Sequence, residues 1–121
     1  MPRDAPNRRT DKRRLPPSGI EAVVEFQQPG AAARSCRLID LSFGDLAFEL
    51  SAGKPGIESG ASLANATVRV GEHSFVCHLS VLRVSRQFNS SLHCGAKLYP
   101  AGEADQNSLV ALIGTLEEAG S

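Results

Sequence analysis

The feature that most constrains this fold is a series of short segments in which apolar and polar residues alternate. Period-two alternation is typical of half-buried β-strands, whose successive side chains point to opposite faces of a sheet. Stretches rich in Gly, Pro and Ser, at residues 27–33, 51–61 and 71–72, separate the runs and favour turns. The alternating segments are residues 20–26, 36–41, 46–50, 67–70, 74–84 and 92–98.

The C-terminal part of the chain has a different period. Its apolar residues recur at i, i+3, i+4 and i+7, which predicts an amphipathic helix at about residues 104–119. We expect Asp105 to cap its N-terminus by accepting from a free first-turn N–H. Gly114 costs the helix about 1 kcal/mol relative to alanine, so the stripe should be held by docking on an apolar surface. The stripe consists of Leu109, Leu112, Ile113 and Leu116.

Together these patterns predict a mainly all-β fold: an antiparallel barrel of roughly six short strands, followed by one helix that covers an open end. Closure into a barrel would leave no exposed strand edges. The 121 residues are enough for one core. Because aromatic residues make up only 5% of the chain and Trp is absent, the core must consist mostly of aliphatic side chains and Phe.

Charge divides the chain into two parts. The net charge is zero, but residues 1–17 carry six basic and two acidic side chains, and the remainder carries seven and eleven. Several prolines lie in residues 1–19, which favours neither a helix nor an inner strand. We therefore predict a flexible basic arm at residues 1–19 and a barrel with its helix at residues 20–121. Such an arm either binds an anionic partner or is a solubilising tail.

Several classes of protein are disfavoured. The N-terminus lacks the apolar region of a signal peptide, and no run of residues approaches the length of a membrane span, so we expect a cytoplasmic protein that does not insert into a membrane. There is no nucleophile elbow, phosphate loop or paired-acid pattern, so we expect no catalytic residues and no enzymatic activity.

The cysteines are predicted to be core residues rather than disulfide partners or metal ligands. Three widely spaced cysteines do not form a disulfide framework. The pairs Cys77-His78 and His93-Cys94 contain four possible metal ligands, but strand neighbours point to opposite faces, so we expect no four-ligand zinc site. Cys77 and Cys94 are in phase with the apolar residues and are predicted to be buried.

Two short motifs suggest a binding function. The arm contains five basic residues within residues 8–14, among them Arg9 and Arg13 in an R-x-x-x-R spacing. Asp40 and Ser42 leave the second predicted strand in a D-x-S spacing, and the tight connection Phe43-Gly44 follows. This order, a basic arm before the first strand and D-x-S after the second, resembles the two signatures of PilZ domains. The late Gly95-Ala96-Lys97-Leu98 also resembles the G-x-x-F strand of that family.

The resemblance implies a PilZ-type barrel from a bacterial signalling protein that binds the second messenger cyclic di-GMP. By this resemblance Arg9, Arg13, Asp40, Ser42 and Gly44 are ligand-binding residues. An arginine just before the first motif residue is associated in the family with a stacked pair of dinucleotides, and Arg8 holds that place. The chain departs from the family at Asp45, where a Gly is expected. An added carboxylate beside an anionic ligand would repel it.

Elementary chemistry supports the same ligand. A guanidinium is a planar fork that pairs with phosphate oxygens, or with O6 and N7 of guanine. The carboxylate of Asp40 can accept from N1–H and N2–H of guanine, and the hydroxyl of Ser42 can donate or accept beside it. Because these two residues are two apart on an extended segment, we expect both side chains on one face.

These observations predict a receptor in which cyclic di-GMP orders the arm over the barrel and so signals to an unidentified effector protein. One alternative is a degenerate PilZ-like module that binds no nucleotide and acts as a protein adaptor, since Asp45 replaces Gly. Another is nonspecific nucleic-acid binding through the arm, which the zero net charge and the scarcity of aromatic residues disfavour. We therefore expect no specific DNA or RNA partner.

Overall fold

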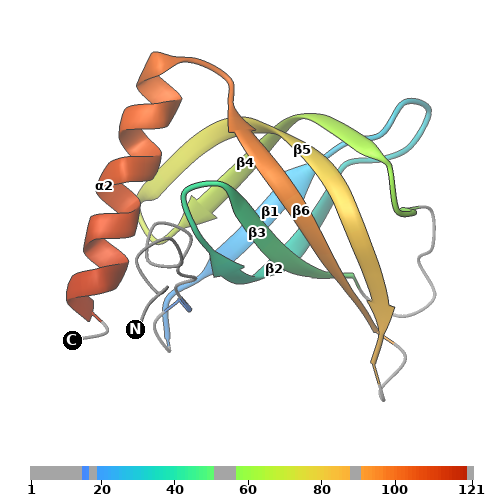
Figure 1. Ribbon diagram of the computed structural model, residues 1–121, viewed down its shortest axis with the longest axis horizontal. Helices are drawn as coiled ribbons and strands as arrows, with labels where there is room; N and C mark the ends of the chain where they lie inside the picture. The colour runs from blue at the N-terminus through green and yellow to red at the C-terminus, as the bar shows by residue number, and fades with distance from the viewer. Residues whose placement is uncertain (1–14, 17–18, 51–56, 88–90, 120–121) are drawn as a thin grey trace, which may run out of the picture.

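The computed structural model describes residues 15–16, 19–50, 57–87 and 91–119. They form six strands and one helix (Figure 1). In these residues no helix is long and apolar enough to cross a membrane. The elements are β1 (Ala22–Phe26), β2 (Arg34–Leu41), β3 (Asp45–Leu50), β4 (Ser62–Val70), β5 (His73–Arg86), β6 (Leu92–Pro100) and α2 (Glu103–Ala119).

The strands form a closed antiparallel barrel in the order β1-β2-β3-β6-β5-β4. The fold predicted from the sequence is therefore confirmed, although β4 begins at Ser62, earlier than the alternation indicated. The predicted turn at residues 71–72 joins β4 and β5, whose terminal residues Val70 and His73 are partners. Gly71 has a φ of 59°, and a glycine with positive φ at the first of two loop positions fits the type II′ turns that suit hairpin twist.

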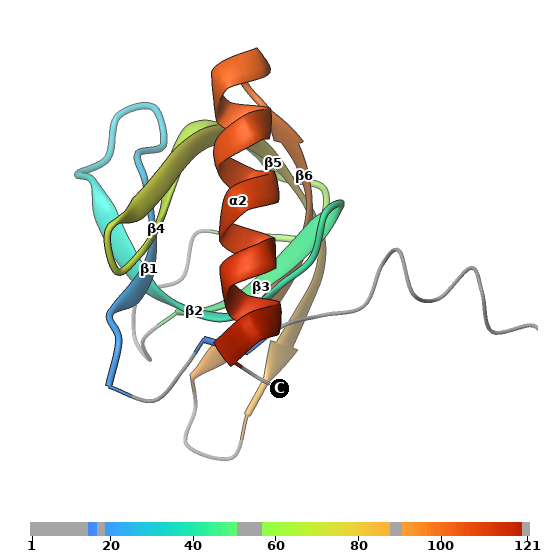
Figure 2. The ribbon, with the colours of Figure 1, turned by 90° about the vertical axis from the view of Figure 1, so that its left-hand side faces the viewer.

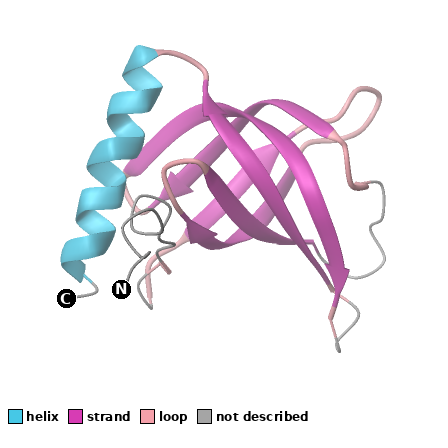
Figure 3. Cartoon of the chain, viewed as in Figure 1, coloured by secondary structure: helices cyan, strands magenta, loops and turns pink. Residues whose placement is uncertain are grey.

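One buried cluster fills the barrel and includes side chains of the helix, which lies against the barrel (Figure 2). The inward-facing strand residues are almost completely buried, and the rings of Phe26 and Phe48 pack with their centroids 5.8 Å apart. The helical stripe predicted from the sequence joins this cluster, because Leu109, Leu112, Ile113 and Leu116 are all buried. The helix packs mainly against β5, and Figure 3 shows it beside the strands as the only helix of the described chain.

Three register shifts interrupt the strict alternation: one in β4, between Leu63 and Ala66, and two β-bulges in β2 and β5. In β2 the register shifts between Leu38 and Asp40, and in β5 it shifts between Val81 and Arg83. Each bulge adds one residue to its strand, Ile39 or Leu82, and reverses the phase of the side chains beyond it. The alternation expected to continue through residues 74–84 therefore ends at Leu82.

The predicted role of Asp105 as the helix N-cap is wrong. The helix begins at Glu103, so Asp105 lies inside its first turn, and its Oδ1 accepts a hydrogen bond from the backbone N–H of Val76 at 2.8 Å. The cause is the end of the neighbouring strand: β6 stops at Pro100, opposite Cys77, and the carboxylate supplies an acceptor for the next N–H along β5. Asp105 thus ties the helix to the barrel.

Candidate ligand-binding groove

The predicted site residues fall into two groups. Arg8, Arg9 and Arg13 lie outside the described residues. Asp40, Ser42 and Gly44 lie at the end of β2 and in the turn before β3. Of these three, Asp40 is half-buried on the outer face of the barrel, where it lines a surface groove.

Ser42 does not stand beside Asp40 on that face. Its side chain is fully buried, and its hydroxyl donates to Oδ1 of Asp45 at 2.8 Å while it accepts from the N–H groups of Asp45 and Gly44. The expectation of a shared face is wrong because the chain leaves the extended conformation after Leu41. Strand alternation no longer applies in the tight turn, and Ser42 organises that turn instead.

Gly44 and Asp45 fit the turn without backbone strain. Neither Gly44 nor Asp45 has a positive φ, and Asp45 is the first residue of β3. The carbonyl of Gly44 accepts from the N–H of Leu98 at 3.0 Å, which ties the turn to β6. The shift of glycine by one position is therefore accommodated, and Asp45 uses its carboxylate to hold Ser42.

A row of four residues crosses the outer face of four adjacent strands. The register pairs Asp40 of β2 with Ala47 of β3, Ala47 with Gly95 of β6, and Gly95 with Arg83 of β5. All four line a groove of about 270 Å³, together with Ile39, Ser85, His93 and Cys94. The groove thus has small side chains in its floor, a carboxylate at one end and a guanidinium at the other.

The adjacent row of outward side chains forms a charged rim. Oε1 of Glu49 accepts from Nε of Arg37 at 3.0 Å, and Oε2 accepts from the hydroxyl of Ser91 at 3.0 Å and lies 3.6 Å from Nε2 of His93. The hydrogen bonds from Ser91 and Arg37 lower the pKa of the Glu49 carboxyl. Glu49 is therefore ionised and already paired at the edge of the groove.

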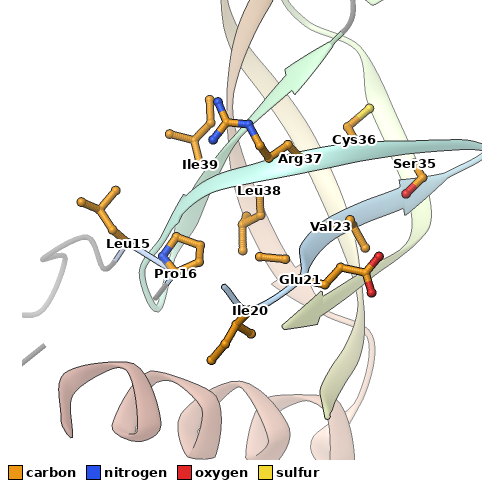
Figure 4. Close-up of a pocket in the computed structure, with 11 residues that line it drawn as sticks. Leu15, Pro16, Ile20, Glu21, Val23, Ser35, Cys36, Arg37, Leu38 and Ile39 are labelled. Carbon is orange, nitrogen blue, oxygen red and sulfur yellow. The ribbon is translucent and has the colours of Figure 1, made fainter. Parts of the chain in front are cut away.

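The start of the described chain lies next to this groove. Leu15 and Pro16 line a cavity of about 620 Å³ over β1 and β2, and Figure 4 shows them on the same side of β2 as Ile39. Ile39 lines both this cavity and the groove that contains Asp40. The arm that precedes Leu15 is consequently attached beside the acidic end of the groove.

Of the eight residues that line the groove, the sequence predicted only Asp40 for the site. Four of the missed residues are far apart in the sequence, and only the pairing of β3, β6 and β5 brings them together: Ala47, Arg83, His93 and Gly95. A signal existed at Gly95: a glycine within an apolar strand indicates a bulge or a close approach of another group. Here the approaching group is the Arg83 guanidinium, 3.6 Å from where a Cβ would lie.

The cysteines occupy the core, as predicted for Cys77 and Cys94. All three are buried free thiols. Burial raises the pKa of Cys77 to about 12 and that of Cys94 to about 11, so both stay protonated at neutral pH. The described residues contain no group of three or more His, Cys, Asp or Glu side chains that could hold a metal ion.

Solved structures share this architecture. The PilZ domain of YcgR from Escherichia coli, described with c-di-GMP, matches with a TM-score of 0.77 at 19% identity over 93% of this chain and 94% of that one. MrkH from K. pneumonia, described as a c-di-GMP complex, matches with a TM-score of 0.78 at 16% identity over 99% of this chain and 55% of that one. The Bacillus subtilis inhibitor of motility MotI matches with a TM-score of 0.61 at 18% identity over 81% and 50%.

These likenesses define the class of the fold as a closed six-stranded antiparallel barrel with a C-terminal helix. More particularly, the chain has the PilZ-type fold that the two motifs implied. It spans nearly all of the isolated YcgR domain but only about half the length of MrkH and MotI. No family model matches the chain, and no curated protein matches it.

Proposed function

We propose that this protein is a non-enzymatic receptor for cyclic di-GMP that acts through a partner protein. The observation that carries the proposal is the position of Asp40, at the end of a groove beside the point where the basic arm is attached. The YcgR and MrkH structures that share the fold are described with this dinucleotide, which supports the same choice of ligand.

The arm is long enough to serve this groove. Arg13 is two residues before Leu15, and Arg9 is six, so a chain that extends about 3.5 Å per residue can carry them roughly 7 Å and 21 Å from Leu15. Leu15 lines the cavity that shares Ile39 with the groove. In our proposal Arg9 and Arg13 bind phosphate and guanine from the side of the ligand that faces away from the barrel. Asp40 accepts hydrogen bonds from the Watson–Crick edge of guanine. Arg8 stacks on a purine.

Ser42 and Gly44 take a supporting part in this proposal. Because the Ser42 hydroxyl is bound within the turn, it shapes the backbone beside Asp40 rather than presenting a free donor to the surface. Gly44 anchors the same turn to β6 through its carbonyl. Binding then orders residues 1–19 over the groove, which changes the surface that an effector protein meets.

Titration calorimetry of the full chain tests the proposal. We expect micromolar or tighter binding of cyclic di-GMP by the wild type, and a loss of at least about a hundredfold in affinity in an Arg9→Ala/Arg13→Ala double variant, since each of the two charged hydrogen bonds contributes roughly 1.5–3 kcal/mol. Arg3→Ala, a basic residue of the arm outside the motif, is the control and should bind like the wild type. No heat with the wild type at high micromolar ligand would reject the receptor function.

A second candidate function is a protein adaptor that binds no nucleotide. The observation that favours it is the Asp45 carboxylate, which accepts the hydrogen bond of the Ser42 hydroxyl and places a negative charge at the turn. If Asp45 opposes an anionic ligand, replacing it with glycine should increase the affinity for cyclic di-GMP, by about tenfold for one relieved repulsion near a protein surface. Calorimetry on Asp45→Gly measures this, and equal affinities would remove Asp45 as a cause of weak binding.

A further inference from the structure

Arg83 forms the basic end of the groove, opposite Asp40. We propose that its guanidinium binds a phosphate of the dinucleotide from the barrel side, with Asp40 at the opposite end binding guanine. This assignment rests on the proposed receptor function and adds to it a phosphate contact that does not come from the arm.

The bulge in β5 is what brings Arg83 to the outer face. Val81 is buried in the core, so regular alternation would place Leu82 outside and Arg83 inside. The extra residue at Leu82 reverses this order: Arg83 becomes the exposed partner of Gly95, and Val84 packs against the core as the partner of Cys94. Bulges recur beside functional sites because they re-aim a side chain in this way.

The floor of the groove leaves room for a flat ligand. The two positions between the charged ends are Ala47 and Gly95, the two smallest amino acids. The Arg83 Nη2 and Nε atoms lie 3.6 and 3.8 Å from the place where a Cβ on residue 95 would be, so the guanidinium rests over the Gly95 backbone. Any larger residue at position 95 would occupy this floor.

The spacing of the row fits one nucleotide between its two ends. Neighbouring strands lie about 4.8 Å apart, so the backbones of Asp40 and Arg83 are separated by three steps, or roughly 14 Å. The guanidinium leans back over Gly95 and shortens this to about 10 Å, two strand steps. A guanine held at its edge by Asp40 would lie over Ala47, with its sugar and then its phosphate directed toward Arg83.

The charges around Arg83 leave it available for an anion. Among the described residues it has no ion-pair partner. In one adjacent row, the carboxylate of Glu49 is already bound by Arg37 and Ser91. A guanidinium pairs with phosphate through two parallel N–H donors, a geometry that a lysine ammonium does not reproduce.

Calorimetry with cyclic di-GMP on Arg83→Gln tests the assignment. We expect the affinity to fall by about tenfold to a hundredfold, the equivalent of a charge-assisted hydrogen bond, and Arg83→Lys to recover only part of it. The affinity of Arg83→Gln should also depend less on salt than that of the wild type, because one ionic contact has been removed. Arg86→Gln, an exposed arginine of the same strand outside the groove, is the matched control and should bind like the wild type.

The outcomes separate this assignment from the function on which it rests. Binding by the wild type, with Arg83→Gln and Arg86→Gln both within twofold of it, would overturn the role of Arg83 and leave the receptor function intact. Equal losses in both variants would also overturn it, since they indicate a diffuse charge effect. No binding by the wild type would overturn the receptor function and the assignment together.

Discussion

Replacing Asp40 with alanine is expected to weaken binding of cyclic di-GMP by about a hundredfold or more. In our proposal its carboxylate accepts two hydrogen bonds from one guanine, and each bond to a charged group contributes roughly 1.5–3 kcal/mol. The same carboxylate should exclude an adenine dinucleotide, which presents no N1–H or N2–H donor pair. Calorimetric titrations of the wild type and Asp40→Ala with cyclic di-GMP and cyclic di-AMP would measure both effects.

A control must remove the same charge elsewhere on the barrel. Glu72 is exposed in the β4–β5 turn and does not line the groove, so Glu72→Ala should leave the affinity unchanged. Thermal unfolding of both variants would separate a loss of ligand contacts from a loss of stability. If Asp40→Ala binds the guanine dinucleotide as tightly as the wild type does, the groove is not the place where guanine is recognised.

Replacing Phe48 with alanine is expected to lower the free energy of unfolding by about 3–5 kcal/mol, the usual cost of removing a buried phenylalanine. Phe48 is completely buried in β3 and packs against Phe26, while its register partners Leu38 and Cys94 also face the interior. The chain has five phenylalanines and no tryptophan, so the core has few large side chains with which to fill the cavity. Urea denaturation followed by circular dichroism would measure the loss.

Leu82→Ala is the matched control for that experiment. Leu82 is 52% exposed at the β5 bulge, so its removal should change the free energy of unfolding by less than about 0.5 kcal/mol. A Phe48→Ala protein within 1 kcal/mol of the wild type would mean that the barrel core does not depend on this ring.

Most of the fold could be predicted because local patterns determine it. The alternating segments gave six strands, the Gly71-Glu72 pair gave a tight hairpin, and the period of Leu109 to Leu116 gave the helix. The position of Asp105 could not be read in the same way. Its carboxylate binds Val76 on a strand 29 residues away, and this contact exists only because β6 ends at Pro100.

The candidate site was less predictable because bulges and register create it. Asp40 could be found from its motif, but Arg83 could not, since strict alternation places it inside the barrel. Ser42 shows the opposite error: its motif suggests a surface donor, whereas the turn buries it and binds it to Asp45. The D-x-S motif therefore lies beside the groove, but the motif alone does not show which of its two side chains lines the groove.

The closed order of the strands limits how a partner protein can bind to such a barrel. Each strand pairs with a neighbour on both sides, and β1 completes the circle by pairing with β4. A partner that recognises proteins by adding a strand to an open sheet edge therefore has no edge to extend in this barrel. Recognition must instead use side-chain surfaces, and the outer faces of β2, β3, β6 and β5, where ligand and arm would meet, form one such surface.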